Sequence, residues 1–268
     1  MKKNARKILA ISLMTVGMAV MMSSCFSGSG TVIGDKIEYT QADLSKKAFD
    51  KIDVETVADV YYTQTNGNEE SVRFDFSKIK DDKLRRQYEE NVVAAYRDGA
   101  VVIGLKDKVV GSSSLTQNNR LCVYITSPDL VKATLSGVGS FVSEAINSDE
   151  FAVDNEGVGY VYIKKLLANK IDVDNEGVGN VTIDNLQGDK LNITNEGVGN
   201  VKIKLFKGGN MKIDNEGVGN VTAHVDCQNI DATLEGIGNI HLSGTTRHIT
   251  KDRDGIGKFS IKDLNIQK

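Results

Sequence analysis

Four glutamates recur at intervals of 20 residues and are the first candidates for chemistry in this chain: Glu156, Glu176, Glu196 and Glu216. Carboxylate oxygens in such a row are the ligands that Ca²⁺ prefers. If consecutive copies stack about 5 Å apart, neighbouring charges repel by roughly 0.8 kcal/mol in water, which a cation would relieve. The alternative is that the carboxylates point into solvent or accept hydrogen bonds from turn amides. A weak calcium site is therefore one expectation, and no other cofactor is expected.

The carboxylates do not form the arrangement that a polysaccharide-cleaving enzyme needs. Such an enzyme places paired carboxyl groups, or a base beside a metal, around one cleft, whereas these side chains form a line. The three histidines, His224, His241 and His248, lack the spacing of metal ligands. We expect a structural role for His224, exposed side chains for the other two, and no catalytic residues. A polysaccharide-active enzyme is the least favoured alternative.

The N-terminus has the pattern of a targeting segment. A basic start is followed by an apolar run over residues 8–22, which is shorter than the roughly 20 residues that span a membrane. Small residues then precede Cys25, as in a bacterial lipobox, although Met22 stands where that motif prefers Leu. We predict a signal peptide over 1–24, lipidation of Cys25, and a flexible tether over 25–46. The alternative is an ordinary secretory signal with an incidental cysteine.

The elements that must position the glutamates belong to an internal repeat. A Gly-x-Gly tripeptide occurs seven times, at steps of 20, 20, 20, 20, 19 and 19 residues. Its glycines are Gly137 and Gly139, Gly157 and Gly159, Gly177 and Gly179, Gly197 and Gly199, Gly217 and Gly219, Gly236 and Gly238, and Gly255 and Gly257. A fixed period of this length is typical of a solenoid, in which each repeat buries its apolar face against its neighbours.

The repeat over 171–183 alternates apolar and polar residues on both sides of its glycines, which indicates strand, turn, strand. A coil of about 20 residues at about 3.3 Å each traces a path of about 66 Å. The fold prediction is an all-β, parallel β-helix with regular coils over 131–266. A flat β-meander of hairpins is the alternative. The glycines are expected at corners, where they supply positive φ or room for closely stacked backbone.

One column of asparagines shares the alternation of the inward apolar residues: Asn155, Asn175, Asn195 and Asn215. Leucine takes the same place near both ends of the array, at Leu135 and Leu234. Side-chain amides stacked from coil to coil can satisfy one another inside a core. We predict a structural asparagine ladder, with ligand binding as the alternative.

Residues 47–130 lack the tripeptide but remain strand-like, so we predict irregular coils and a cap there. The segment 83–95 is the one plausible helix, although its end, 92–96, reads equally well as a strand. Cys122 and Cys227 flank about five coils, or about 24 Å, which exceeds the roughly 7 Å that a disulfide allows between Cα atoms. We predict two free thiols.

Taken together, these segments resemble the GIN-domain family, the auto-transporter adhesin heads of Bacteroides-like bacteria. The matching segments are Phe49–Val54, Asp59-Val60, Asp98–Ile103 and Val123–Leu130, followed by the glycine coils, so that the likeness spans about 47–266. The resemblance implies a right-handed β-helix on a lipoprotein anchor. It supplies no catalytic residues and leaves the partner open.

The expected function is that of a non-enzymatic envelope lipoprotein that binds or adheres through a rigid β-helix surface. Its expected partners are the membrane, through the lipid, and a glycan, a matrix protein or a surface protein. Structural assembly through homo-oligomers is the alternative. A net charge of −3 with mixed signs gives no case for nucleic acid. We expect an outer-membrane location, on the surface or the periplasmic side.

Overall fold

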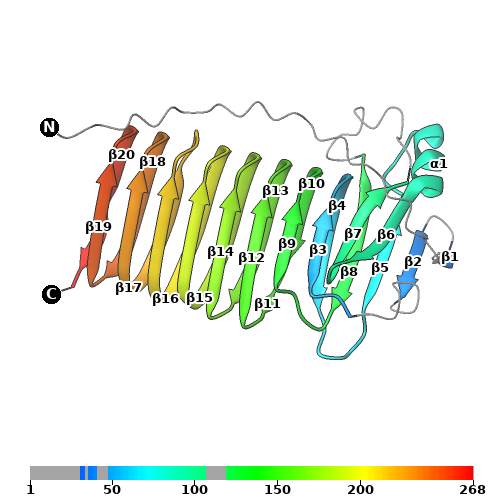
Figure 1. The fold of residues 1–268 in the computed structure, drawn as a ribbon, viewed down its shortest axis with the longest axis horizontal. Helices are drawn as coiled ribbons and strands as arrows, with labels where there is room; N and C mark the ends of the chain where they lie inside the picture. Colours follow the sequence, from blue (N-terminus) through cyan, green and yellow to red (C-terminus); the bar gives the residue numbers. More distant parts are fainter. Residues whose placement is uncertain (1–30, 34–35, 41–47, 107–118, 268) are drawn as a thin grey trace, which may run out of the picture.

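The computed structural model describes residues 31–33, 36–40, 48–106 and 119–267, so the predicted signal peptide and Cys25 lie outside the described residues. The described chain forms one elongated stack of parallel coils with a cap at one end (Figure 1). This is the predicted right-handed parallel β-helix with coils of about 20 residues. Because consecutive coils pair in parallel, the β-meander of hairpins was the wrong alternative.

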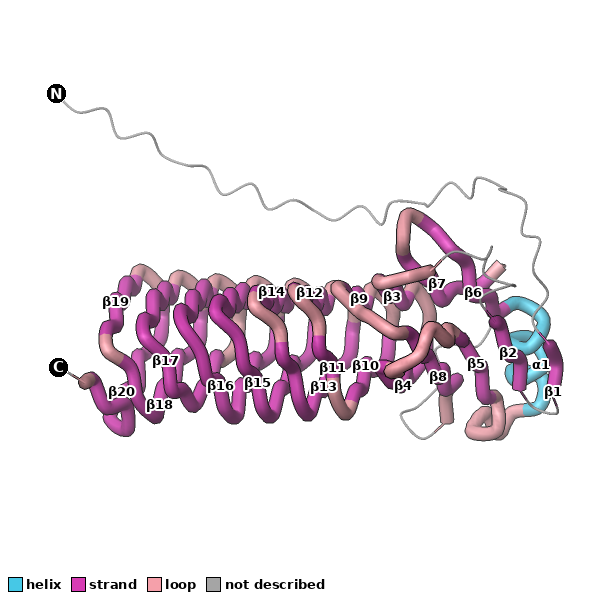
Figure 2. The backbone as a smooth tube through the Cα atoms, turned by 90° about the horizontal axis from the view of Figure 1, so that it is seen from below, coloured by secondary structure: helices cyan, strands magenta, loops and turns pink. Residues whose placement is uncertain are grey.

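Each regular coil contains three extended segments separated by bends. In the coil that begins after Gly157 these are 158–163, 165–167 and 170–175, and Figure 2 shows the coils in succession. The strands of this part are β9 (Lys132–Leu135), β10 (Val138–Ser143), β11 (Ile146–Asn147), β12 (Glu150–Asn155), β13 (Val158–Leu167), β14 (Lys170–Asn175), β15 (Val178–Asn195), β16 (Val198–Asn215), β17 (Val221–Leu234), β18 (Ile237–Thr246), β19 (His248–Arg253) and β20 (Ile256–Ile266).

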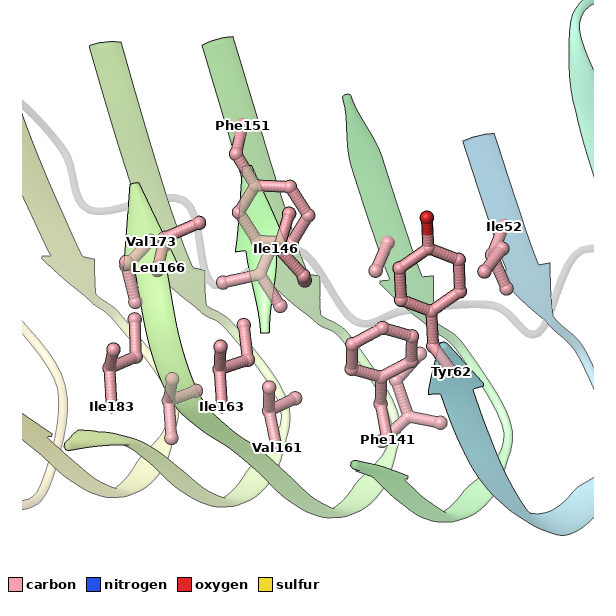
Figure 3. Packing of buried hydrophobic residues seen from close by; sticks show 14 of the residues in the cluster. Ile52, Tyr62, Phe141, Ile146, Phe151, Val161, Ile163, Leu166, Val173 and Ile183 are labelled. Atoms are coloured by element: carbon pink, nitrogen blue, oxygen red, sulfur yellow. The ribbon is translucent and has the colours of Figure 1, made fainter. Parts of the chain in front are cut away.

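The core runs along the inside of the coils as columns of equivalent apolar side chains. Val161 pairs with Val181 on the next coil, and Val181 pairs with Val201 on the one after. All three are fully buried, and Figure 3 shows how Val161, Ile163 and Leu166 from one coil pack against their neighbours. The period-2 alternation therefore sets the burial, and the constant repeat length sets the register.

The glycine corners leave no room for any side chain. A Cβ atom built on Gly179 would lie 1.7 Å from the carbonyl oxygen of Gly159 in the preceding coil. The same short approach recurs at the equivalent glycine of every regular coil after it. Both roles considered for these glycines are observed, since φ is +159° at Gly179 and the stacked backbone leaves no room for a Cβ atom.

The first two strands that belong to the parallel coils do not lie at the start of the stack, although they come first in the sequence. β3 (Lys51–Val54) and β4 (Val57–Gln64) lie between the coil of β7 (Ala100–Leu105) and β8 (Leu121–Ser127) and the coil of β9 and β10. After β4 the chain leaves the stack and forms the cap. β7 and β8 then pair with β3 and β4 on the side of the cap, and β9 and β10 pair with β3 and β4 on the opposite side. This insertion puts Cys122 on β8 one coil further from Cys227 on β17 than expected; both are buried, free thiols.

Antiparallel strands and one helix cover the N-terminal end of the stack. α1 (Asp82–Asn91) begins at Asp81, whose carboxylate accepts a hydrogen bond from the Leu84 amide. The helix is shorter than the expected 83–95, because the β-branched Val92 and Val93 begin β6 (Val92–Arg97). β6 pairs antiparallel with β7, and β5 (Ser71–Asp75) pairs antiparallel with β8. In the described part of the chain no helix is both long and apolar enough to cross a membrane.

Part of the segment assigned to the tether is strand in the structure. β1 (Thr31–Ile33) and β2 (Lys36–Thr40) form an antiparallel pair, and β2 extends the sheet by pairing with β5. The expectation of a flexible tether over 25–46 does not hold for these residues. The alternation of β2, with β-branched or aromatic residues at every second position, favours an added strand.

In the last coil of the described chain, two cations replace residues of the inward columns. In the last coil Lys251 and Arg253 occupy columns that are apolar or amide in the coils before it, and both are exposed. The Arg253 guanidinium donates a hydrogen bond to the Gly257 carbonyl at 2.9 Å. Cations on an open sheet edge discourage a second edge from pairing with it.

Candidate binding surface

The interior asparagines form a buried ladder. Each of Asn155, Asn175 and Asn195 donates from Nδ2 to Oδ1 of the next asparagine at 2.7 Å. The last member, Asn215, donates to the Gly219 carbonyl at 3.2 Å. Only Oδ1 of Asn155, at the other end, lacks a partner. All four side chains are inaccessible to solvent, so the ladder holds the corner together and leaves nothing for a ligand to contact.

The predicted carboxylate row lies on the outside of the same corner. We call it the Glu row, and it consists of Glu156, Glu176, Glu196, Glu216, Glu235 and Asp254. All six side chains are exposed. Burial by the neighbouring coils, and then the adjacent carboxylates, raise the pKa of Glu176 and of Glu216 above the ordinary value. In the described residues no Lys, Arg or His forms an ion pair with any member of the row.

The next acidic column behaves differently, because two of its aspartates are paired with lysines. Asp154 forms an ion pair with Lys132, and Asp214 forms one with Lys212 at 2.6 Å. The Glu row, in contrast, has no member that forms an ion pair within the described residues. Nowhere in the described chain do three or more His, Cys, Asp or Glu side chains gather in a group able to hold a metal ion. Successive glutamates each contribute a single carboxylate to a line.

An exposed apolar row accompanies the Glu row, and the sequence reasoning missed it. The residues between the paired glycines point outward and are 39% to 74% exposed. They form the Val row, which consists of Val138, Val158, Val178, Val198, Val218, Ile237 and Ile256. A shallow groove runs between the Glu row and the Val row, with glycine backbone as its floor. The alternation contained the signal, since Val178 stands two residues after the outward Glu176.

A second amide ladder lies on the surface beyond the Val row. Oδ1 of Asn180 accepts hydrogen bonds from both the backbone N–H and the Nδ2 of Asn200, at 3.0 and 2.9 Å. Asn200 accepts the same two bonds from Asn220, and Asn220 accepts them from Asn239. The oxygens of Asn180, Asn200 and Asn220 thus have both lone pairs engaged, whereas Nδ2 of each amide that follows in the ladder uses one of its two hydrogens. The ladder presents N–H donors to the outside.

These three rows make up one surface, which we call the corner face. Its third row, the Asn row, consists of Tyr160, Asn180, Asn200, Asn220, Asn239 and Lys258. Across the face the side chains are hydrogen-bond acceptors, then apolar groups, then donors. Along the face the same side chain recurs at each coil, about 4.8 Å apart.

A second surface, the polar face, lies on the strands that precede the corner. A shallow depression there is lined by two rows of amide, lysine, hydroxyl and histidine side chains. One row consists of Lys190, Asn210, Asn229 and His248, and the other of Asn192, Lys212, Asp231 and Thr250. Nδ2 of Asn229 donates to Oδ1 of Asn210 at 2.6 Å, so the amides again form a ladder. In the described residues Lys190 forms no ion pair.

The three histidines do not converge on a cleft. His224 is exposed and its Nδ1 lies 3.0 Å from the Ser243 hydroxyl of the next coil. His241 borders a shallow depression beside the Asn row, and His248 lies on the polar face. The surface therefore consists of repeated rows on two open faces, which suits the binding of an extended partner better than reaction in an enclosed site.

The chain is similar to a known protein family and to proteins of solved structure. The family described as "Putative auto-transporter adhesin, head GIN domain" matches residues 48–225 and again 191–268. A "putative adhesin" from Bacteroides fragilis NCTC 9343 is similar in structure, with a TM-score of 0.70 and 24% identity, covering 86% of this chain and 96% of that one. None of the curated proteins compared with the chain matches it.

A second solved structure is more distant. It is a "putative adhesin" from Parabacteroides distasonis ATCC 8503, with a TM-score of 0.56 and 17% identity, covering 88% of this chain and 98% of that one. At these identities the two structures support the fold alone. The matched segment begins close to the predicted start of the resemblance, at residue 48.

Proposed function

The chain belongs to the family of auto-transporter adhesin heads with a GIN domain, and from this premise we propose that it is a non-enzymatic binding module of the cell envelope. Its contact surface in this proposal is the polar face. The partner is a glycan, a matrix protein or a neighbouring surface protein with a repeated structure. The family's adhesin name supports a binding role of this kind.

One observation supports the proposal above the others: the polar face places a polar side chain at the same two positions of each successive coil on a rigid frame. Its side chains are lysine, amide, hydroxyl, imidazole and, at Asp231, carboxylate groups, which together donate and accept hydrogen bonds. The depression is shallow and open, so that a long partner lies across several coils without entering a pocket. Many weak, equivalent contacts then add along one partner chain, as in multivalent binding.

An array experiment tests this proposal. The full chain is screened against immobilised glycans and matrix proteins, and the K190A/K212A variant is compared on every hit. Both lysines are exposed on the polar face, and K207A is the matched control, because Lys207 is an exposed lysine on another segment of the same coil type. We expect binding that falls at least tenfold in the polar-face variant and is unchanged in the control. Absence of binding on all arrays contradicts the proposal.

We further propose that the protein is an outer-membrane lipoprotein held through lipid on Cys25. The sequence motif supports this proposal, and the residue lies outside the described part of the chain. Labelling cells with a radioactive fatty acid tests it, with C25S as the control that loses the label. Protease shaving of intact cells then separates surface display from a periplasmic location. Label on the C25S variant contradicts the anchor.

A weak calcium contact at the Glu row stays a prediction. Sedimentation of the full chain in calcium and in chelator measures it. A calcium-dependent change that disappears in an E176Q/E196Q variant supports the contact, and identical sedimentation in both conditions excludes it.

A further inference from the structure

The corner face carries three kinds of unused binding capacity at once. The Glu row forms no ion pair within the described residues, the Val row exposes branched apolar side chains, and each amide of the Asn row keeps one free N–H. A row of apolar side chains with this exposure on a regular surface marks an interaction site. A single partner that is apolar in the middle and polar on both sides engages all three rows.

The partner must also keep step with the coils. From Glu156 to Asp254 the Glu row covers five coil steps, or about 24 Å at about 4.8 Å each. An extended peptide along the rows repeats its side chains about every 6.7 Å on one face, and an α-helix advances about 5.4 Å per turn. The peptide loses register at once, and the helix has drifted by about 3 Å over the five steps. A second coil stack of this chain has the same repeat and stays in register throughout.

We propose that the corner face binds a second copy of this chain in a parallel, two-fold symmetric dimer. The two-fold axis runs along the Val row, parallel to the β-helix axis, so that the Val rows of the two copies pack on each other. This rotation keeps coils at the same level and exchanges the two sides of the face. The Glu row of each copy therefore lies opposite the Asn row of its partner, as an isologous interface requires.

The residue types match at each level under this operation. Glu176, Glu196, Glu216 and Glu235 each lie opposite an asparagine, namely Asn180, Asn200, Asn220 and Asn239 of the other copy. At the first level Glu156 lies opposite the hydroxyl of Tyr160, and at the last level Asp254 lies opposite the ammonium group of Lys258. Every acceptor thus has a donor. The antiparallel alternative places the Glu row against the partner's Glu row and is disfavoured by repulsion.

The corner face is small, so we expect two copies of the chain to associate weakly unless they are held side by side in the same orientation. A strip about 24 Å long and about 13 Å wide, four residues across, buries roughly 300 Å² on each copy. The total is well below the roughly 1,200 Å² of stable complexes. In a parallel dimer the cap ends of the two copies lie together, and β1, where the described chain begins, lies at that end of the stack (Figure 1). Two chains anchored in one membrane meet at a high effective concentration, which offsets the weak affinity of so small an interface. In this point the inference rests on the proposed lipid anchor.

Site-specific cross-linking of the full chain in cell membranes tests the dimer. V158C and I256C introduce thiols at the second and the last members of the Val row, and a short bifunctional thiol reagent is added to the membranes. L167C is the matched control, because Leu167 is 45% exposed on β13 but lies outside the corner face. We expect V158C to link to V158C and I256C to link to I256C, with no product from L167C. In cells that express both variants with different tags, no link joins position 158 to position 256.

The outcomes separate this inference from its alternatives. A link between positions 158 and 256 means an antiparallel pair and overturns the proposal, as does the absence of links from the Val row in membranes. Adding V198D to the V158C chain should reduce the linked fraction at least tenfold, and an undiminished fraction also overturns it. Array binding that survives without cross-links leaves the proposed function intact and removes the dimer. Cross-links without array binding support the dimer and contradict the proposed function.

Discussion

The asparagine ladder predicts that the same substitution, asparagine to leucine, costs much stability in the middle of the ladder and little at its end. N195L interrupts the middle of the ladder. The Asn175 Nδ2 donor and the Asn215 Oδ1 acceptor then both lose partners that they now bond at 2.7 Å. Both groups are shielded from solvent, and an unsatisfied buried polar group costs about 1–3 kcal/mol. The expected loss is about 2–6 kcal/mol in the free energy of unfolding.

N155L changes the end of the same ladder and serves as the matched control. It leaves Oδ1 of Asn175 without a donor, but it also removes Oδ1 of Asn155, which has no partner already. The number of unsatisfied acceptors therefore stays the same. Leucine fits this column, since Leu135 and Leu234 occupy it in the adjoining coils and are buried. We expect a change within about 1 kcal/mol.

Thermal unfolding followed by circular dichroism measures both variants. For a chain of this size each kcal/mol shifts Tm by about 2–4 °C. N195L should therefore melt several degrees or more below the wild type, and N155L should melt close to it. Equal shifts for the two variants would refute the reasoning, because they would mean that the hydrogen bonds along the ladder contribute nothing beyond the volume of the side chain.

Three further predictions concern the corner and the ends of the stack. G179A should cost more than about 4 kcal/mol or prevent folding, because its Cβ meets a carbonyl of the preceding coil at 1.7 Å, whereas G67A, with nothing within 4 Å, should be neutral in the same melting assay. The pKa of Glu176 is raised above its ordinary 4.5 in the folded chain. Protonated Glu176 therefore contributes its full stabilisation of the fold below pH 4.5, and this stabilisation is lost as the pH rises through the raised pKa. Wild type should therefore lose Tm relative to E176Q between pH 4 and pH 7, and a constant difference contradicts this. K251V/R253L should open the last coil to pairing and shift the chain to larger species in size-exclusion chromatography, and a single unchanged peak argues against charge as the cap.

The regular half of the fold follows from the sequence because each of its constraints repeats. The parity of Val161 and Val181 sets which side is buried, and the step of 20 residues sets which residues are neighbours. The inward place of Asn175 comes from the same parity. Continued through the corner, the alternation places Val178 outside together with Glu176, yet the apolar type of Val178 suggests a core residue. Alternation and hydrophobicity disagree at that position, and the alternation was the better guide.

The cap could not be derived in the same way, because no repeat constrains it. Nothing local indicates that β3 and β4 lie between two coils formed later in the chain, since that order depends on pairing between distant segments. The end of α1 at Asn91 was ambiguous for a local reason, as Val92 and Val93 fit either element. The polar face was missed because its lysines and amides look individually like ordinary surface residues. Only the stacking of the coils shows that they form rows.

A coil-by-coil scan of the polar face tests the central claim most directly, which is that equivalent side chains on successive coils bind one partner together. Asn210, Asn229 and His248 lie in one row on three successive coils. Each is changed to alanine, singly and in combination, and affinity for the strongest array ligand is measured by calorimetry. The account predicts similar losses from each substitution, which add in the combined variants. Loss of all binding through one residue, with the others neutral, would contradict it and indicate a single local site.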